Sequence, residues 1–315
     1  MDTLYGWMMY ILSLLTVGGI YAIMGLGLNL QWGITGLFNI GVAGFFAVGG
    51  YASAIATTKL SPNHLGGFDF PFITGILFAM FFSGLMAAII GKICLRLRGD
   101  YLAIATIGLA EILRLILKNE VWLTNGPRGI PGIPRPFENL GQPWSEICYL
   151  LIILLILAII FYGFEKAIDS PWGRIMKAIR ENEEAAASTG KNVENLRLET
   201  FVIGSVFMGL GGALLTHSMK YIGPTASDPL ITTFLLWVML IVGGSGNNKG
   251  AIVGAFIIWT VWSASELLSG ILSYEWINRL SYFRIFLIGF ILQLILQNRP
   301  QGLIPEKSSN IGKNT

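Results

Sequence analysis

The stretch Ile147-Cys-Tyr-Leu-Leu-Ile-Ile-Leu-Leu-Ile-Leu-Ala-Ile-Ile-Phe-Tyr-Gly-Phe164 decides the fold class of this chain. It carries no charged residue and is an almost unbroken run of leucine and isoleucine. A helix needs about 20 apolar residues to cross the hydrocarbon core of a bilayer. The stretch therefore predicts a transmembrane helix.

The composition of the whole chain agrees with a protein whose main solvent is lipid. Of its 315 residues, 54% are hydrophobic and only 12% are charged, which does not fit a water-soluble domain. The net charge of +3 is small and scattered, so it gives no indication of a nucleic-acid partner. The two cysteines, Cys94 and Cys148, are too few for a disulfide framework.

Hydrophobic run length predicts an all-α, polytopic transmembrane helix bundle with about nine spans in a single domain, residues 1–315. Two runs are unusual, because 37–57 is crowded with glycines and 231–242 is short. Either could be a broken or re-entrant helix, since irregular backbone is tolerated at membrane depth only where protein or a water-filled cavity covers it. The nine runs are 5–30, 37–57, 71–95, 101–117, 147–164, 198–217, 231–242, 251–268 and 282–297.

The placement of Lys and Arg predicts the orientation of these spans, because short cytoplasmic loops carry the excess of basic residues. With nine crossings, the three basic connections share one side, which places the N-terminus outside and the C-terminal tail inside. The outer connection 119–146 contains five prolines, and we expect an ordered cap rather than a helix there. The basic residues behind this orientation are Lys92, Arg96, Arg98, Arg174, Lys177, Arg180, Lys191, Arg197, Arg299, Lys307 and Lys313.

The cytoplasmic connection 170–197 is too regular to be a passive linker and predicts two short helices. Ser170 is a typical N-cap, and Pro171 suits the first helical position. Asn182 can cap the second helix, and Gly190 can end it in a left-handed turn. The first helix presents an apolar stripe made of Trp172, Ile175, Met176 and Ile179.

In this connection, the sequence Glu184-Ala185-Ala186, followed after three positions by Gly190, resembles the EAA loop of ABC-importer permeases. In that family the loop forms a coupling helix that sits in a groove of the cytoplasmic ATPase. The resemblance thus implies a coupling role for Arg174, Glu184, Ala185, Ala186 and Gly190. The alternative is an Ala-rich helix with a solvated charged face. Further along, 195–199 (Asn-Leu-Arg-Leu-Glu) replaces the family's Ile-x-Leu-Pro element, which leaves the docking of this half open.

A wider set of motifs, in matching order, resembles the LivM type of branched-chain amino-acid permease, within the hydrophobic amino-acid and urea permease family. The resemblance implies a permease subunit of an ATP-driven, binding-protein-dependent importer in the bacterial cytoplasmic (inner) membrane. It further implies a sister permease, two ATP-binding subunits that bind ATP and Mg, and an extracytoplasmic substrate-binding protein, with no cofactor in this chain. Related permeases carry urea, short amides or other amino acids. The motifs are Leu26-Gly-Leu-Asn-Leu30, Gly44-Phe-Phe-Ala-Val-Gly-Gly-Tyr51, Leu97-Arg-Gly-Asp-Tyr-Leu-Ala103, Glu111-Ile-Leu-Arg114, Leu123-Thr-Asn-Gly-Pro127, Val242-Gly-Gly-Ser-Gly246 and Arg299-Pro-Gln-Gly-Leu-Ile-Pro305.

Several residues within the membrane are candidates for the translocation path. The N-terminus of an unwound half-helix can bind a substrate carboxylate through its N–H groups, and the glycine-rich run 41–50 could supply one. Close helix packing is the alternative for these glycines. Glu111 could bind a substrate ammonium group or pair with Arg114, three residues further on. The candidates are Gly41, Gly44, Gly49, Gly50, Asn29 and Glu111.

Two other classes of protein remain to be weighed. Gly243-Gly-Ser-Gly246 superficially resembles the serine motif of rhomboid intramembrane proteases, but no histidine follows Ser245 in the sequence. The chain also lacks a Walker A phosphate loop and a His-Glu-x-x-His metal helix, so we expect no catalytic or metal site. An ATP-independent channel or secondary transporter is the stronger alternative, although it leaves the structured cytoplasmic connection unexplained.

Overall fold

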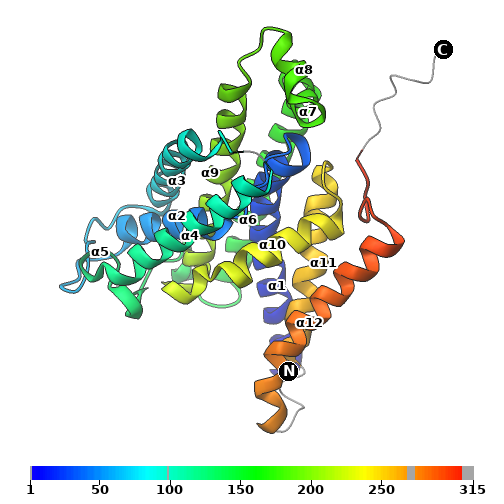
Figure 1. Ribbon diagram of the computed structural model, residues 1–315. Coiled ribbons are helices and arrows are strands. Elements are labelled where there is room, and N and C mark those ends of the chain that lie inside the picture. Colours follow the sequence, from blue (N-terminus) through cyan, green and yellow to red (C-terminus); the bar gives the residue numbers. More distant parts are fainter. Residues whose placement is uncertain (1, 98, 268–273, 307–315) are drawn as a thin grey trace.

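The structure is a computed structural model that describes residues 2–97, 99–267 and 274–306. Three basic residues used to predict the orientation, Arg98, Lys307 and Lys313, lie outside these residues, as does position 268, the predicted end of the eighth span. Among the described residues, the predicted apolar runs lie on helices except at their ends, of which 37–41 is the longest irregular part, and the β structure is one pair of two-residue strands. The chain is therefore an all-α polytopic bundle (Figure 1).

The long helices follow one another along the chain, and the longest connection is the one between α4 and α6. The first half holds α1 (Asp2–Leu28), the π-helix η1 (Asn29–Ile34), α2 (Val42–Thr57), α3 (Phe72–Cys94), α4 (Asp100–Asn119) and α5 (Val121–Thr124). The second half holds α6 (Trp144–Asp169), α7 (Pro171–Glu181), α8 (Glu183–Ser188), α9 (Val193–Met219), α10 (Pro229–Gly243), α11 (Asn248–Leu267) and α12 (Tyr274–Asn298).

Six of the described helical segments are long and apolar enough to cross a membrane, fewer than the nine runs predicted. The helix α2 has only 16 residues, which at about 1.5 Å per residue is shorter than a bilayer core. The helix α4 is long enough but carries Asp100, Glu111, Arg114 and Lys118. The apolar part of α12 is short as well. The six segments are Leu4–Ile34, Phe72–Cys94, Trp144–Asp169, Val193–Met219, Pro224–Gly243 and Asn248–Leu267.

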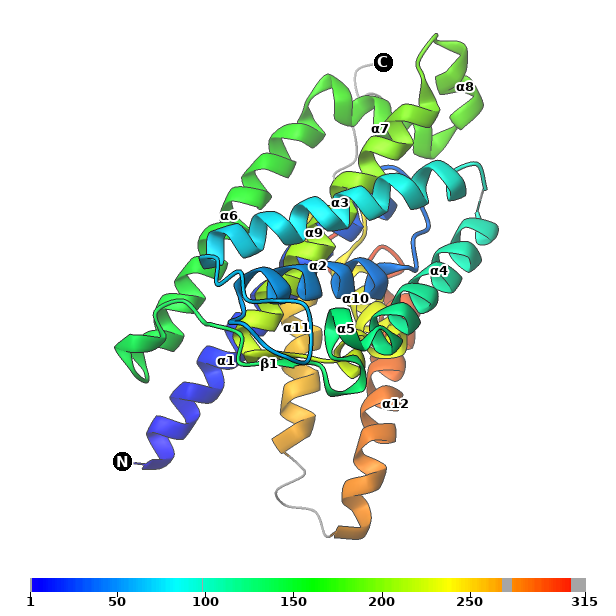
Figure 2. The same ribbon diagram turned by 90° about the vertical axis from the view of Figure 1, so that its left-hand side faces the viewer.

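The short helix α2 lies inside the molecule. It contacts α3, α4 and α9, and most of its residues are buried, including the bulky Phe45, Phe46 and Tyr51 (Figure 2). Because α2 has almost no surface left for lipid, its length need not match the bilayer. Its hydrophobic side chains pack against protein instead, so neighbouring helices hold it in place.

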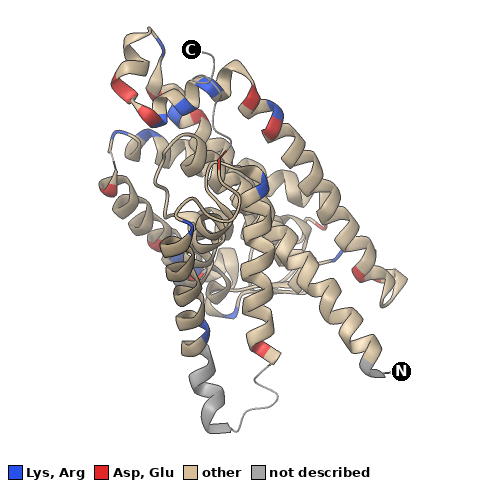
Figure 3. Cartoon of the chain, turned by 90° about the vertical axis from the view of Figure 1, so that its right-hand side faces the viewer, with Lys and Arg blue, Asp and Glu red and all other residues tan. Residues whose placement is uncertain are grey.

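Charged residues gather at the end of the molecule that carries α7 and α8, whereas the long helices are mostly uncharged between their ends (Figure 3). The N-terminal end of α1 lies at the opposite end of the molecule (Figure 1). This distribution is the one that the sequence predicts for a bundle with its basic connections on one side.

The connection between α4 and α6 is ordered by contacts with the end of α9. Its strand β1 (Ile130–Pro131) pairs with β2 (Tyr221–Ile222), and Arg135 forms an ion pair with Glu146 at 2.5 Å. Its helical pieces are short: α5 and the 3₁₀ turns η2 (Gly126–Arg128) and η3 (Glu138–Leu140). Nearby, Lys220 donates a hydrogen bond to Glu138 at 2.5 Å, which holds the pKa of Glu138 below its usual range.

Candidate functional site

The two helices that the sequence predicts between α6 and α9 are present as α7 and α8. Asn182 caps α8, because its side chain accepts a hydrogen bond from the Ala185 N–H at 3.0 Å. Gly190 has a φ of +79°, and its N–H donates to the Ala187 carbonyl at 3.0 Å. The chain therefore turns back towards α9 at a position where the left-handed conformation favours glycine.

One face of α7 and α8 packs on the long helices. Met176 and Ile179 of the predicted apolar stripe are only 0% and 5% exposed. Thr200 of α9 donates a hydrogen bond to the Met176 sulfur at 3.2 Å. Arg197, also on α9, forms an ion pair with Glu183 of α8 at 3.0 Å. The two short helices are thus fixed to the end of α9.

The face of α7 and α8 that points away from the long helices is open to solvent. Of the five residues predicted to couple to an ATPase, Arg174, Glu184, Ala185 and Gly190 are exposed. The fifth, Ala186, is 7% exposed and belongs to the packed face. Their coupling role stays a prediction, and the exposed four are placed where a cytoplasmic partner could reach them.

The backbone between α1 and α2 is irregular where it lies next to α7. The last turn of α1 widens into the π-helix η1, a geometry found often at functional sites. Residues 36–41 then run without regular secondary structure, although most of this stretch is buried or half-buried. The irregular backbone therefore precedes α2, which is itself continuous, and a broken or re-entrant passage over 37–57 stays a prediction.

Two buried amide side chains stabilise the irregular stretch. Gln31 donates hydrogen bonds to the Phe201 carbonyl at 2.7 Å and to the Ser205 hydroxyl at 3.1 Å, both on α9. Asn39 donates to the Gln31 side chain at 2.9 Å and accepts from the Gly41 N–H at 2.8 Å. Buried backbone that lacks helical hydrogen bonds needs such partners. Asn39 thus supplies a partner for one such N–H group, that of Gly41, and Gln31 ties Asn39 to α9.

A second polar cluster joins the start of η1 to two other helices. Asn29 donates to the Asn248 side chain of α11 at 2.9 Å and accepts from the Gly246 N–H at 2.8 Å. Asn248 in turn donates to Glu165 of α6 at 3.1 Å. Asn29 therefore makes interhelical hydrogen bonds, and its predicted place in the path stays a prediction.

The glycines of the run 41–50 sit where helices approach closely. A Cβ atom added at Gly49 would overlap the Gly209 carbonyl oxygen of α9. Such contacts are what close packing requires, while the predicted path role of these glycines stays a prediction. A Cβ added at Gly41 would lie 2.7 Å from the Thr106 carbonyl oxygen. One added at Gly44 would lie 3.0 Å from the Ala110 Cα, and one added at Gly50 would lie 2.8 Å from the Thr216 hydroxyl.

The N–H groups at the start of α2 have threonine partners. The Ile40 N–H donates to the Thr106 hydroxyl at 3.1 Å, and the Ala43 N–H donates to the Thr233 hydroxyl at 3.1 Å. A substrate carboxylate would have to compete with these hydroxyls for the two N–H groups. The Thr106 hydroxyl comes from α4 and the Thr233 hydroxyl from α10, so both helices stabilise the start of α2.

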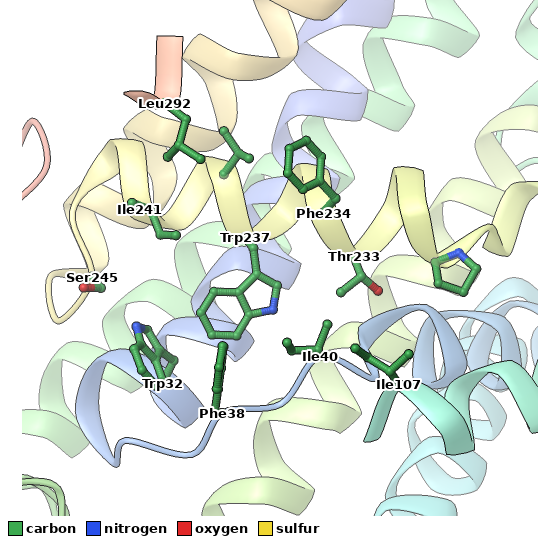
Figure 4. Close-up of a pocket in the computed structure, with 12 residues that line it drawn as sticks. Trp32, Phe38, Ile40, Ile107, Thr233, Phe234, Trp237, Ile241, Ser245 and Leu292 are labelled. Carbon is green, nitrogen blue, oxygen red and sulfur yellow. The ribbon is translucent and has the colours of Figure 1, made fainter. Parts of the chain in front are cut away.

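An apolar groove of about 670 Å³ lies beside the break (Figure 4). Trp32 of η1, Phe38 of the irregular stretch and Trp237 of α10 form its wall, with ring centroids 4.9 to 5.4 Å apart. The Trp237 ring N–H donates to the Asn39 carbonyl at 3.1 Å, which fixes the ring. Other lining residues include Ile40, Ile107, Phe234, Ile241 and Leu292, with hydroxyl groups from Thr233 and Ser245.

The volume of the groove is within the range of small-molecule sites, about 300–1,000 Å³. Sequence reasoning missed these lining residues, because isolated aromatic residues in apolar runs look like ordinary core.

Glu111 lies outside this groove and pairs with its neighbour. Arg114 donates two hydrogen bonds to the Glu111 carboxylate, at 2.8 and 2.5 Å. This is the ion pair that the spacing allows on one helix face. The geometry therefore favours pairing over a substrate ammonium site.

Removing both charges, as in Glu111→Gln with Arg114→Gln, should leave transport within about twofold of wild type, because the two side chains pair with each other and do not line the groove. Initial uptake rates over a range of substrate concentrations would check this expectation. A KM raised tenfold or more, with unchanged maximal rate, would instead indicate an ammonium site.

The serine motif lacks the geometry of a protease dyad. His217 uses both ring nitrogens, with Nε2 2.8 Å from the Ser53 hydroxyl and Nδ1 2.7 Å from the Pro134 carbonyl. Ser245 instead lines the groove. Across the part of the chain that the structure describes, no group of three His, Cys, Asp or Glu side chains could hold a metal ion.

Comparison with known proteins relates the chain to transport permeases. It is 30% identical to the LivM permease of the high-affinity branched-chain amino acid transport system of Escherichia coli K12, over 92% of this chain and 69% of that protein. It is 27% identical to a probable LivM permease of Methanocaldococcus jannaschii, over 92% and 91%. It is also 24% identical to the LivH permease of Salmonella typhimurium, over 91% and 94%. No solved structure matches the chain.

The profile of the family described as "Branched-chain amino acid transport system / permease component" matches residues 10–296, most of the chain. The matched region contains the irregular stretch before α2, the groove and the short helices α7 and α8. On this match and the LivM relatives, the chain belongs to that family of transport permeases.

Proposed function

We propose that this permease subunit imports branched-chain or other amino acids in an ATP-driven complex of the bacterial cytoplasmic (inner) membrane. The complex would contain a sister permease, two ATP-binding subunits that hold ATP and Mg, and an extracytoplasmic substrate-binding protein. The names of the LivM and LivH relatives support this assignment. The exposed surface of α7 and α8 favours a transporter that is coupled to an ATPase. A channel or secondary transporter that works without ATP would need no such docking surface.

We further propose that the chain crosses the membrane nine times, with α2 as a short, protein-covered passage. On the side of α7, the end of η1, the start of α11 and the segment after α12 lie together, through contacts of Gly33, Asn248 and Glu306. On the other side, β1 pairs with β2, and the Leu65 N–H donates to the Trp122 carbonyl at 2.6 Å. These contacts support a cytoplasmic α7 and an external N-terminus.

The apolar groove is the observation that carries the substrate assignment. Its wall of three aromatic rings and several aliphatic side chains suits a branched aliphatic side chain. Urea and short amides need several hydrogen-bond partners, and an apolar wall would leave their polar groups unpaired. We therefore place the groove on the translocation path and favour amino acids over urea.

Uptake by the purified complex would test this assignment. The complex would be isolated with its partners through a tag on this chain and reconstituted into liposomes with internal ATP. Leucine, isoleucine, valine, other amino acids and urea would be compared. ATP-dependent uptake of leucine, isoleucine or valine would support the proposal, and uptake of urea alone would overturn the substrate choice.

Filling the groove should slow transport. Ile107 lines the groove, and Ile107→Trp would push a larger ring into it. The ring would obstruct the proposed path, so leucine uptake should fall about tenfold, which corresponds to about 1.4 kcal/mol in the barrier. Ile104→Trp is a matched control, because Ile104 is 67% exposed on the same helix and does not line the groove. Equal rates for both variants would argue against this path.

A further inference from the structure

Arg180 of α7 holds three separate elements together. One guanidinium nitrogen donates to the Gly33 carbonyl at the end of η1, and another pairs with Glu306 at 2.9 Å. The carbonyls at a helix C-terminus lack helical partners and attract cations. The Arg180 side chain also passes directly over Gly36, where an added Cβ would lie 3.0 Å from the Arg180 Cγ. Arg180 therefore caps the C-terminal end of η1 from the short helix α7.

Glu306 is itself fixed to α10 by the segment that precedes it. The Leu303 N–H donates to the Val242 carbonyl, and the Ile304 N–H donates to the Gly243 carbonyl, each at 2.9 Å. The Glu306 carboxylate also pairs with Lys177 of α7 at 3.2 Å. Through Glu306, α7 is thus connected to the end of α10.

The two elements that α7 contacts in this way, η1 and α10, form walls of the apolar groove. The helix η1 and the stretch after it carry Trp32 and Phe38, and α10 carries Trp237 and Ile241 (Figure 4). A displacement of α7 would therefore pull on both walls at once, through Arg180 on one side and Glu306 on the other.

We propose that Arg180 and Glu306 are positioning residues that transmit movement of α7 to the groove, and so link ATP use by the partner subunits to transport. This inference rests on the proposed function, because it assumes that α7 and α8 receive the motion of an ATPase. Beyond that function, the inference identifies the residues of this chain that transmit the movement of α7 to the groove.

The chemistry of the two side chains fits a mechanical link better than a stabilising one. Their side chains are 27% and 28% exposed, and ion pairs at such exposure contribute little to folding. The planar guanidinium fork of Arg180 can hold a carbonyl and a carboxylate at the same time, whereas a lysine ammonium group lacks this geometry. Loss of the link should therefore reduce coupling while the complex still assembles.

The test measures leucine uptake and ATP hydrolysis in the same reconstituted complex. Arg180→Ala should lower the leucine transported per ATP hydrolysed by about tenfold, a typical size for a coupling effect. Arg180→Lys should also lower the ratio, although less, and Glu306→Gln should do the same, since each keeps part of the link. The control is Arg96→Ala, which removes another exposed arginine near the same end. It should leave the ratio unchanged.

A labelling experiment shows whether the motion reaches the groove. Ile40→Cys would be introduced into a chain in which Cys94→Ala and Cys148→Ser remove the native thiols. ATP binding should change the rate at which a maleimide labels position 40, which lines the groove. In the Arg180→Ala background, this change should be lost even though the protein is present in normal amounts.

The results separate the inference from the proposed function. If the wild-type complex shows no ATP-dependent uptake of amino acids, the proposed function fails. If wild type transports leucine and Arg180→Ala keeps both its transport ratio and its ATP-dependent labelling change, only the inferred link is overturned. If Arg180→Ala prevents assembly while Arg180→Lys and Glu306→Gln couple normally, the pair is structural and the inference is also overturned.

Discussion

Replacing Gly49 by valine is expected to leave little or no folded permease in the membrane. A side chain at this position would overlap the Gly209 backbone of α9, which cannot rotate away as a flexible side chain could. Gly209 is also packed against Ser83 of α3, since a Cβ added at Gly209 would overlap the Ser83 hydroxyl. Overpacking of a core costs about 1–3 kcal/mol and occasionally more, and here three helices would have to separate.

The amount of chain that elutes as a single species in detergent, and its melting temperature, would measure this effect. Gly163→Val is the matched control, because Gly163 lies on α6 with open space where its Cβ would be. The companion variant Gly44→Val should be milder, since the added atom at Gly44 would lie 3.0 Å from its neighbour. If both variants assembled normally and transported at full rate, neither packing nor a path role would describe these glycines.

The substitution Gly190→Pro should abolish transport without affecting membrane insertion. Proline fixes φ near −65°, whereas Gly190 has a φ of +79°, so the turn after α8 could not form. The Cβ of a substituted residue would meet open space there, and the long helices would be unaffected. Misplacing the exposed surface of α7 and α8 should lower ATP-driven leucine uptake by more than about hundredfold.

Uptake and co-purification of the ATP-binding subunits would be measured together. Gly190→Asn is the control, because asparagine tolerates the left-handed conformation and should keep most of the activity. Glu184→Lys should also abolish transport, since it reverses a charge on the exposed surface that is proposed to contact the ATP-binding subunits. Normal uptake in Gly190→Pro and Glu184→Lys would count against coupling through this segment.

Local sequence rules predict the short helices well, because their signals lie within a few residues. Ser170 and Pro171 begin α7, Asn182 caps α8, and Gly190 takes up the left-handed turn, as the sequence predicts. Each of these features depends on the residue's own backbone preference or on a hydrogen bond to a near neighbour. Long apolar runs predict the helices of the bundle for the same reason.

The break and the groove could not be predicted in this way, because their contacts are distant in sequence. Trp237 reaches the Asn39 carbonyl across 198 positions, and Gln31 reaches Phe201 across 170. The length of apolar runs also predicts more membrane-spanning helices than hydropathy supports. The run 101–117, for example, forms α4, which mixes aliphatic residues with Glu111 and Arg114. Packing of α2 inside the molecule is a property of the assembled helices and has no local signal.

The link from Arg180 to Glu306 also sets an order of events during biosynthesis. The two residues are 126 positions apart, so a ribosome that adds about 5–20 residues per second makes Glu306 roughly 6–25 seconds after Arg180. During this interval the chain that forms α8, α9, α10, α11 and α12 is made, while the carboxylate is still missing. The contact between α7 and the end of α10 through Glu306 therefore cannot form until α12 has been made.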